Sequence, residues 1–326
     1  MKGLYTEKVT DINQINMFKE ILKIINPMLS DQIYIERFYD NDKGYNRKYN
    51  VYKIVTHCQV YVLKKSDDIE ISVYEKYLDN KNLPVPKFYG WAYINKTKWI
   101  LMDHIDGPDL RIFNMDMASR CAYSLAHIFN MYWQEVSFED DEQINRFERY
   151  WTRINKRSEC LINYSKLSSA YGIFLDRQLS CPRTLCNGDF LQFNAIESEK
   201  GIIVIDWAFA GIMPYSIDIA RLIAHGSDKY FPFPFYMTNE YRKIFVQAMY
   251  DKLLFKPDYK QFIWDIILAC LNECIEFIES ELNDISIERD DIFTYYYESA
   301  EALADVILNG KEHLKTDALF HIFNIG

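Results

Sequence analysis

The chain has 326 residues, of which 49% are hydrophobic and 16% aromatic, so it can bury one large core or two medium ones. Its formal net charge of −10 argues against nucleic acid as a partner, because nucleic-acid-binding proteins carry a surplus of Lys and Arg. No apolar run approaches the roughly 20 residues that cross a bilayer, and residues 1–20 lack the apolar core of a signal peptide, so a membrane partner is not expected.

The first hundred residues are predicted to contain a helix followed by a small sheet. Apolar residues recur at helical spacing over 10–29, and Thr10 or Asp11 can cap the start of this helix. Alternating or β-branched residues then predict five strands, over residues 32–38, 50–55, 60–64, 88–93 and 98–102. The polar stretch 39–49, which contains Gly44, is predicted to be the loop between the first two strands. A helix over 69–78 is predicted after the third strand.

Beyond residue 103 the prediction is mainly helical. Residues 103–110 contain Gly107-Pro108 and are predicted to form an extended segment that leads into a helix over 117–133. Apolar residues at helical spacing predict further helices within 137–180 and over 239–255, 259–282 and 290–308. A loop is predicted over 231–235, where Phe and Pro alternate.

One central stretch carries acidic side chains at the ends of two apolar runs. Asp189 follows the first run, Asp206 follows the second, and Asn194 lies five residues after Asp189. Residues 202–205 are four consecutive β-branched residues, which favour a buried strand, and residues 197–201 suit a hairpin turn. We expect this reversal of the chain to bring two carboxylates and one amide oxygen to a single place. Oxygen ligands of this kind suit Mg²⁺.

These residues resemble the motifs of the aminoglycoside phosphotransferase family, which are small-molecule kinases of the protein-kinase-like fold. The family pattern is His-Gly-Asp, four residues, Asn, and then an apolar strand ending in Ile-Asp-Trp. It is matched by Asn187-Gly188-Asp189, Asn194 and Ile205-Asp206-Trp207, with Asn187 in place of the usual His. Asp218-Ile219-Ala220 matches the start of the helix that follows. By motif, the resemblance covers about residues 35–225.

The resemblance implies an α+β fold of two lobes. Residues 1–103 would form an N-terminal lobe with a small antiparallel sheet that binds the nucleotide. Residues 104–326 would form a larger, mainly helical lobe for catalysis and acceptor binding. The backbone carbonyl of Asp103 and the backbone amide of Ile105 would bond to the adenine base.

The resemblance also implies a role for each motif residue. Lys64 would neutralise the α- and β-phosphates and would be oriented by Glu75, with Glu70 as the competing partner. Asn194 and Asp206 would hold Mg²⁺.

Within the catalytic loop, Asp189 would accept a hydrogen bond from the acceptor hydroxyl and help to remove its proton. Asp218 would brace this loop by bonding to its backbone. Asn187 would be a scaffold group that bonds neither metal nor substrate.

The implied activity is transfer of the γ-phosphate of ATP or GTP to a hydroxyl of a small, amine-bearing, aminoglycoside-like molecule, with Mg²⁺ as cofactor and antibiotic resistance as the associated function. Two alternatives stay open: a choline, sugar or amino-alcohol kinase of the same fold, and a catalytically weak kinase-like binding protein.

Residues 256–326 hold five Lys or Arg against fifteen Asp or Glu. This surplus is either a set of solvated helix faces or a wall that attracts a cationic acceptor. Seven cysteines without a Cys-x-x-Cys pair indicate reduced thiols and a cytoplasmic protein.

Overall fold

The computed structural model describes residues 4–29, 33–42, 45–134, 141–226, 235–284 and 286–323. Gly44 and most of the predicted loop over 231–235 lie outside these residues. The chain forms two compact units, and each is assembled from two separate segments. The first unit comprises Met1–Asp109 and Ala195–Ala210, and the second comprises Leu110–Asn194 and Gly211–Gly326. A lobe boundary between residues 103 and 104 stays a prediction.

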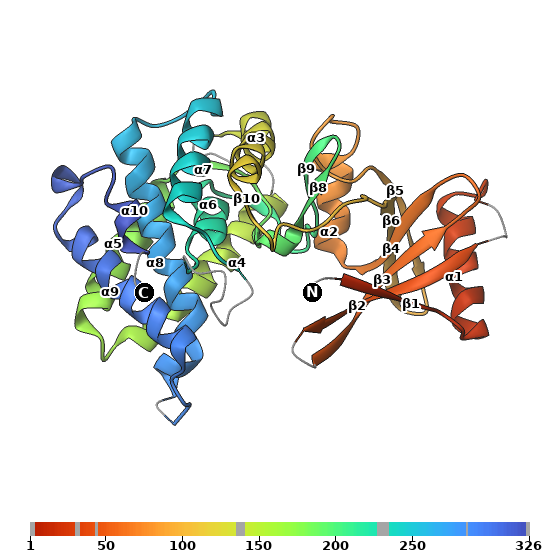
Figure 1. Ribbon diagram of the computed structural model, residues 1–326, viewed down its shortest axis with the longest axis horizontal. Coiled ribbons are helices and arrows are strands. Elements are labelled where there is room, and N and C mark those ends of the chain that lie inside the picture. The colour runs from red at the N-terminus through yellow and green to blue at the C-terminus, as the bar shows by residue number, and fades with distance from the viewer. Residues whose placement is uncertain are drawn as a thin grey trace. The chain divides into compact units, whose positions relative to one another are not determined.

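The first unit is built on a six-stranded antiparallel sheet with the order β1-β2-β3-β4-β6-β5. Its strands are β1 (Leu4–Lys8), β2 (Tyr34–Asp42), β3 (Tyr45–Val55), β4 (Val60–Ser66), β5 (Phe88–Ile94) and β6 (Thr97–Asp103). Helix α1 (Ile12–Ile25) begins after Asp11, whose carboxylate accepts the N–H groups of Asn13 and Gln14. The helix packs on one face of the sheet, where Phe18 contacts the rings of Tyr52 and Trp99 (Figure 1).

The sheet differs from the sequence-based prediction at its N-terminal side. The polar stretch predicted as a loop is largely strand, because β2 and β3 stay paired through Tyr39↔Lys48 and Asp40↔Arg47. Strand β1, which pairs with β2, was not predicted. Ladder hydrogen bonds join backbone groups, so a hairpin that is exposed to water can extend through polar residues that show no alternation.

A second, two-stranded sheet completes the first unit. Strands β8 (Ala195–Ser198) and β9 (Gly201–Val204) form the predicted hairpin, with Gly201 at a φ of 123°. The hairpin lies against the segment that follows β6, where the Glu197 amide donates to the Pro108 carbonyl at 2.9 Å. Gly107, at a φ of 144°, allows this approach, because a Cβ there would collide with the Glu197 carbonyl. The hairpin thereby fixes the start of the segment that carries Asp206.

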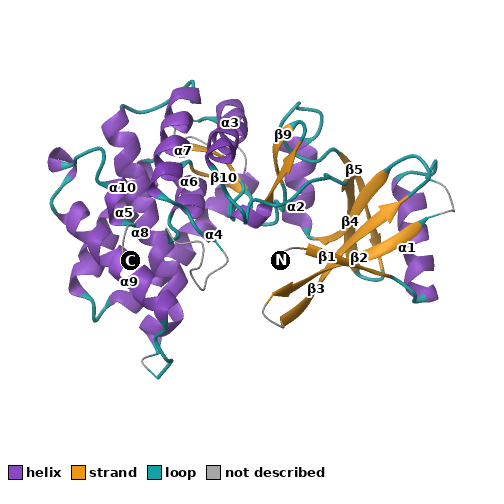
Figure 2. Ribbon diagram, viewed as in Figure 1, coloured by secondary structure: helices purple, strands orange, loops and turns teal. Residues whose placement is uncertain are grey.

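The second unit is mainly helical (Figure 2). Its helices are α3 (Met115–Tyr132), α4 (Asp141–Arg157), α5 (Ser165–Ser180), α6 (Ser216–Ile223), α7 (Asn239–Lys252), α8 (Tyr259–Asn283), α9 (Asp291–Leu308) and α10 (Leu319–Ile322). Two short strands, β7 (Arg183–Cys186) and β10 (Gly211–Pro214), pair antiparallel. Helix α8 is buried along most of its length and supplies much of the core of this unit. Within the described residues, no helix is both long and apolar enough to cross a membrane.

A buried histidine follows α6 and gives the fold a pH-dependent contribution to stability. The ring nitrogens of His225 lie 2.9 Å from the Tyr296 hydroxyl and 2.9 Å from the Arg221 carbonyl oxygen. Burial and, second, the charge of Arg221 together lower the pKa of His225 to about 3. The unfolded chain takes up a proton near pH 6.5, whereas the folded chain does not. The stability contributed by His225 is therefore present above pH 6.5 and is lost as the pH falls toward 3.

We expect the urea midpoint of the wild type to fall more steeply with decreasing pH than that of His225→Gln. The difference corresponds to about 3 kcal/mol between pH 6.5 and 4, because each pKa unit is worth about 1.4 kcal/mol. The matched control is His321→Gln, since the His321 side chain is 65% exposed. Parallel pH profiles for the wild type and His225→Gln would contradict the neutral, buried state of His225.

Candidate functional site

In the first unit, Lys64 lies between two carboxylates. Its Nζ is 2.7 Å from Oε1 of Glu70 and 2.8 Å from Oδ1 of Asp206. Glu70, only 1% exposed, also accepts the Ser66 hydroxyl at 2.8 Å and the Trp207 amide at 3.3 Å. This one carboxylate therefore connects β4, the helix that carries Glu70 and the segment that follows β9.

The charges of this cluster are coupled. Burial by itself would lower the pKa of Lys64, but Glu70 and Asp206 together raise it above its ordinary value. Burial raises the pKa of Glu70 more than the adjacent ammonium lowers it. The short distances from Lys64 to Glu70 and to Asp206 favour a charged ammonium. The cluster thus holds a fixed positive charge at the end of a strand.

The predicted pairing of Lys64 with Glu75 is wrong, and the competing partner Glu70 is the observed one. Only Asp67 separates the end of β4 from helix α2 (Asp68–Val73), and this residue caps the helix by accepting the Glu70 amide. Glu70 therefore lies in the first helical turn, next to the end of the strand. Glu75 lies in the π-helical turn η1 (Tyr74–Leu78) and accepts the indole N–H of Trp91 at 2.9 Å.

Asp206 has an unusual backbone conformation. Its φ of 57° lies in the left-handed region, which costs a non-glycine residue about 1–2 kcal/mol, although Asp tolerates it better than most. The side chain is 44% exposed, and one of its oxygens contacts Lys64. Backbone strain of this kind is concentrated at functional sites, where the surrounding structure maintains it.

The end of β6 borders a pocket of about 360 Å³. The pocket is lined by Lys53, Gln59, Val60, Asp103, His104 and Asp106. The Asp103 carboxylate accepts the hydroxyl of Tyr89 and the amide of Gln59, each at 2.7 Å. Burial and the bond to Asp103 raise the pKa of Tyr89 to about 12. These bonds hold the end of the strand in place, whereas adenine binding by the Asp103 carbonyl and the Ile105 amide stays a prediction.

In the second unit, both oxygens of the Asp189 carboxylate accept hydrogen bonds. Oδ1 accepts Nε of Arg221 at 3.0 Å and Nη2 of Arg221 at 2.7 Å. Oδ2 accepts Nδ2 of Asn194 at 3.0 Å, and the same amide donates to the Asp189 carbonyl at 2.7 Å. Asp189 is therefore oriented from two sides, by its own loop and by α6.

The loop before Asp189 is held by Asp218, a fully buried residue of α6. Its Oδ2 accepts the Asn187 amide at 2.6 Å, and its Oδ1 accepts the Gly188 amide at 2.9 Å. Burial raises the pKa of Asp218 to about 7, although these two N–H donors oppose the shift. The Asn187 side chain accepts the Asp189 amide at 3.3 Å, so Asn at this position supports the loop from within.

Sequence reasoning missed Arg221. Its guanidinium bonds to Asp189, and its Nη1 lies 2.6 Å from Glu273 and 3.3 Å from Glu276 of α8. A signal was present, because Arg221 follows Asp218 by three residues and so lies on the same helix face as the loop brace. Glu273 and Glu276 gave no such signal, since they belong to a helix that is far from Arg221 along the chain.

The chemistry of Asn194 and Asp206 suits Mg²⁺. The Asn194 amide nitrogen is used by Asp189, which leaves its carbonyl oxygen as the atom of this amide that can bind a cation. Mg²⁺ requires only one or two protein ligands when phosphates and water complete its shell. Among the described residues there is no group of three or more His, Cys, Asp or Glu suited to a metal. Joint binding of Mg²⁺ by Asn194 and Asp206 stays a prediction.

A family model described as the phosphotransferase enzyme family, APH, matches residues 50–241, which is more than half of the chain. The chain belongs to this phosphotransferase family. The family recognised from the sequence motifs is thereby confirmed. No curated protein matches the chain.

Solved structures similar to this family member have the kinase-like fold predicted from the sequence. An aminoglycoside phosphotransferase from Alicyclobacillus acidocaldarius has a TM-score of 0.56 at 12% identity, covering 91% of this chain and 96% of the other. A choline kinase from Streptococcus pneumoniae has a TM-score of 0.53 at 17% identity, covering 89% and 99%. An ethanolamine kinase from Plasmodium vivax has a TM-score of 0.54 at 15% identity, covering 88% and 87%. The predicted fold class is confirmed.

Six of the fifteen carboxylates in residues 256–326 of this phosphotransferase-family chain pair with basic residues of earlier helices. Their partners are Arg or Lys of α4, α5 or α6: Asp265 pairs with Arg177, Glu273 with Arg221, Glu276 with Arg157 and Arg221, Glu279 with Arg157, and Glu301 and Asp305 with Lys166. Because these six carboxylates share the four cations Arg157, Lys166, Arg177 and Arg221 inside the unit, part of the acidic surplus is used within the protein rather than offered to a cationic acceptor.

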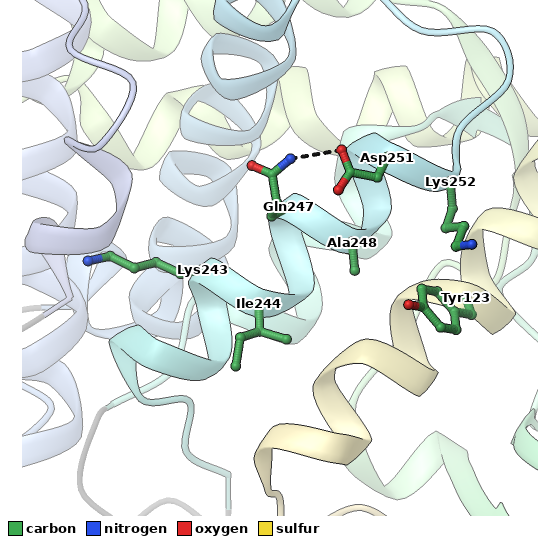
Figure 3. A pocket seen from close by; sticks show the side chains of 7 residues that line it. All are labelled: Tyr123, Lys243, Ile244, Gln247, Ala248, Asp251 and Lys252. Atoms are coloured by element: carbon green, nitrogen blue, oxygen red, sulfur yellow. Dashed lines mark hydrogen bonds between the residues drawn. The ribbon is translucent and has the colours of Figure 1, made fainter.

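A further groove of about 550 Å³ lies between α3 and α7. Figure 3 shows Tyr123 of α3 facing side chains of α7, with Gln247 bonded to Asp251 at 2.8 Å. The lining of this groove includes none of the residues that the family motifs contain. The groove therefore gives no support to a role in phosphotransfer.

Proposed function

We propose that this chain is a Mg²⁺-dependent phosphotransferase that moves the γ-phosphate of ATP or GTP to a hydroxyl of a small, amine-bearing molecule, aminoglycoside-like in kind. The observation that carries the proposal is the cluster of Lys64, Glu70 and Asp206 in a chain of this family. A paired ammonium at a strand end, beside an acidic residue in a strained turn, is suited to a nucleotide's phosphates and their metal ion.

Each residue has a separate role in the proposed reaction. Lys64, oriented by Glu70, binds the α- and β-phosphates, and Asp206 and Asn194 bind Mg²⁺, which neutralises charge on the phosphates when bound. Asp189 accepts the proton of the acceptor hydroxyl. The acceptor oxygen forms a bond to the γ-phosphorus, the bond from that phosphorus to the β–γ bridging oxygen breaks, and the nucleoside diphosphate leaves. Positioning and charge compensation supply most of the rate enhancement.

A choline, ethanolamine or sugar kinase is the alternative within the same chemistry. Choline and ethanolamine kinases are among the structurally similar proteins, and their acceptors also join a hydroxyl to an amine. A catalytically weak binding protein is the third candidate, and Asn187 in place of His favours it. The intact set of Lys64, Asp189, Asn194 and Asp206 favours an enzyme.

The free thiols of all seven cysteines support a reducing compartment such as the cytoplasm.

The nucleotide is tested first, by thermal unfolding with Mg-ATP and with Mg-GTP. A nucleotide at 100 times its Kd stabilises the folded state by about 2.7 kcal/mol, so the Tm rises by several degrees. The matched control is the same nucleotide with excess EDTA, which is expected to abolish most of the rise. No rise with either nucleotide would contradict the proposal.

The acceptor is tested by a coupled assay for nucleoside diphosphate release, over aminoglycosides, choline, ethanolamine and sugars. Turnover is expected with an amine-bearing hydroxyl compound and not with the same compound lacking its hydroxyl. Turnover with neutral sugars alone would move the assignment to a sugar kinase. Nucleotide binding without turnover on any compound would favour a binding protein.

A further inference from the structure

The contacts around Asp189 extend beyond the residues that the family motif contains. Arg221 donates two hydrogen bonds to Oδ1 of Asp189, and its remaining Nη1 points to Glu273 and Glu276. The Arg221 side chain is 18% exposed, and its guanidinium lies 5.3 Å from the ring centre of Phe277. A single planar group thus joins the catalytic loop, α6 and α8.

We propose that Arg221 is a positioning residue that fixes the carboxylate of Asp189, and that Glu273 and Glu276 hold Arg221 in place instead of binding an acceptor amine. This inference rests on the proposed function, because it assigns Asp189 to the acceptor hydroxyl. The negative charges of Glu273 and Glu276, close to Asp189, would by themselves suit a cationic acceptor. Their short contacts with Arg221 assign them to the protein's own cation.

The arrangement also selects one oxygen of Asp189 for the reaction. A carboxylate oxygen accepts about two hydrogen bonds, and Arg221 supplies two to Oδ1. The acceptor hydroxyl therefore bonds to Oδ2, the oxygen that Asn194 also contacts. Asn194, which is proposed to bind the metal ion, thus orients the same oxygen that receives the proton.

A lysine cannot reproduce this geometry. The guanidinium is planar, so it bonds Asp189 through Nε and Nη2 while Nη1 faces α8. A compact ammonium has no such fork and cannot hold both sides at these distances. Arg221→Lys therefore keeps the charge and loses the orientation of Asp189.

The test compares Arg221→Lys with the wild type, using the hydroxyl compound that gives the highest turnover in the coupled assay. We expect kcat to fall about 10- to 100-fold, because small displacements of a catalytic group cost about this much. The acceptor KM and the Kd for Mg-ATP are expected to stay within about threefold. Glu273→Gln is expected to show the same pattern at smaller magnitude.

The matched control is Arg177→Lys, which breaks another Arg–carboxylate pair with two hydrogen bonds, that of Arg177 in α5 with Asp265 in α8. Its kcat is expected to stay within about twofold of the wild type, even if its Tm falls as much as that of Arg221→Lys. An equal loss of kcat in both variants would reduce Arg221 to a structural role. A raised acceptor KM with unchanged kcat in Glu273→Gln would show that the glutamate binds the acceptor. Either result would overturn the inference.

A second measurement does not depend on turnover. In a double-mutant cycle with Asp189→Asn and Arg221→Met, the changes in Tm are expected to be non-additive, because the two side chains contact each other. Additive changes would overturn the inference even if the wild type is active. If the wild type binds no nucleotide and transfers no phosphate, the proposed function fails, and with it the assigned role of Arg221.

Discussion

Asp189→Asn is expected to lower kcat by about 10³-fold, within the range that a general base contributes. Asparagine has nearly the same shape and keeps one oxygen that accepts hydrogen bonds, so the loop held by Asp218 is expected to persist. It cannot take up the proton of the acceptor hydroxyl. Affinity for Mg-ATP, measured by calorimetry, is expected to stay within about threefold, since Asp189 is not assigned to the nucleotide.

The control for this variant is Glu301→Gln, which neutralises a carboxylate that pairs with Lys166 in the same unit. It is expected to keep the wild-type kcat. If Asp189→Asn lost Mg-ATP affinity in parallel with kcat, the carboxylate would belong to the nucleotide site, and its assignment to the acceptor hydroxyl would be wrong.

Glu70→Gln is expected to lower kcat/KM for Mg-ATP by at least tenfold, whereas Glu75→Gln stays within about twofold of the wild type. Glu70 uses both oxygens, with Lys64 on one and the Ser66 hydroxyl on the other. The amide of Gln carries no charge, so it holds the Lys64 ammonium less strongly and lets Lys64 move toward Asp206. Breaking a buried ion pair from one side costs up to about 3–5 kcal/mol, and the remaining bond to Asp206 reduces that cost.

Glu75→Gln is a closely matched control, because it removes the same charge from the same helical segment. The amide oxygen of Gln can still accept the indole N–H of Trp91. Kinetics with Mg-ATP and urea midpoints of both variants check the prediction. Equal kinetic losses, or a larger loss for Glu75→Gln, would restore the pairing expected from the sequence.

The sequence by itself determined the family and the fold class. Asp189, Asn194 and Asp206 lie within about twenty residues of one another, so their spacing is visible in the chain without any knowledge of packing. The β8–β9 hairpin is local in the same sense, because four β-branched residues and one glycine predict it. Local motifs of this kind depend on neighbours in the chain, which a sequence displays directly.

Only the tertiary structure decided which partners hold the functional side chains. Lys64 had two candidate glutamates five residues apart, and the start of α2 directly after β4 selected Glu70. Arg221 meets Asp189 across 32 positions and Glu273 across 52, because α6 packs against α8. The pairing of six carboxylates of α8 and α9 with basic residues of earlier helices likewise follows only from packing. Contacts between distant segments depend on how helices pack against one another, and no spacing along the chain encodes that arrangement.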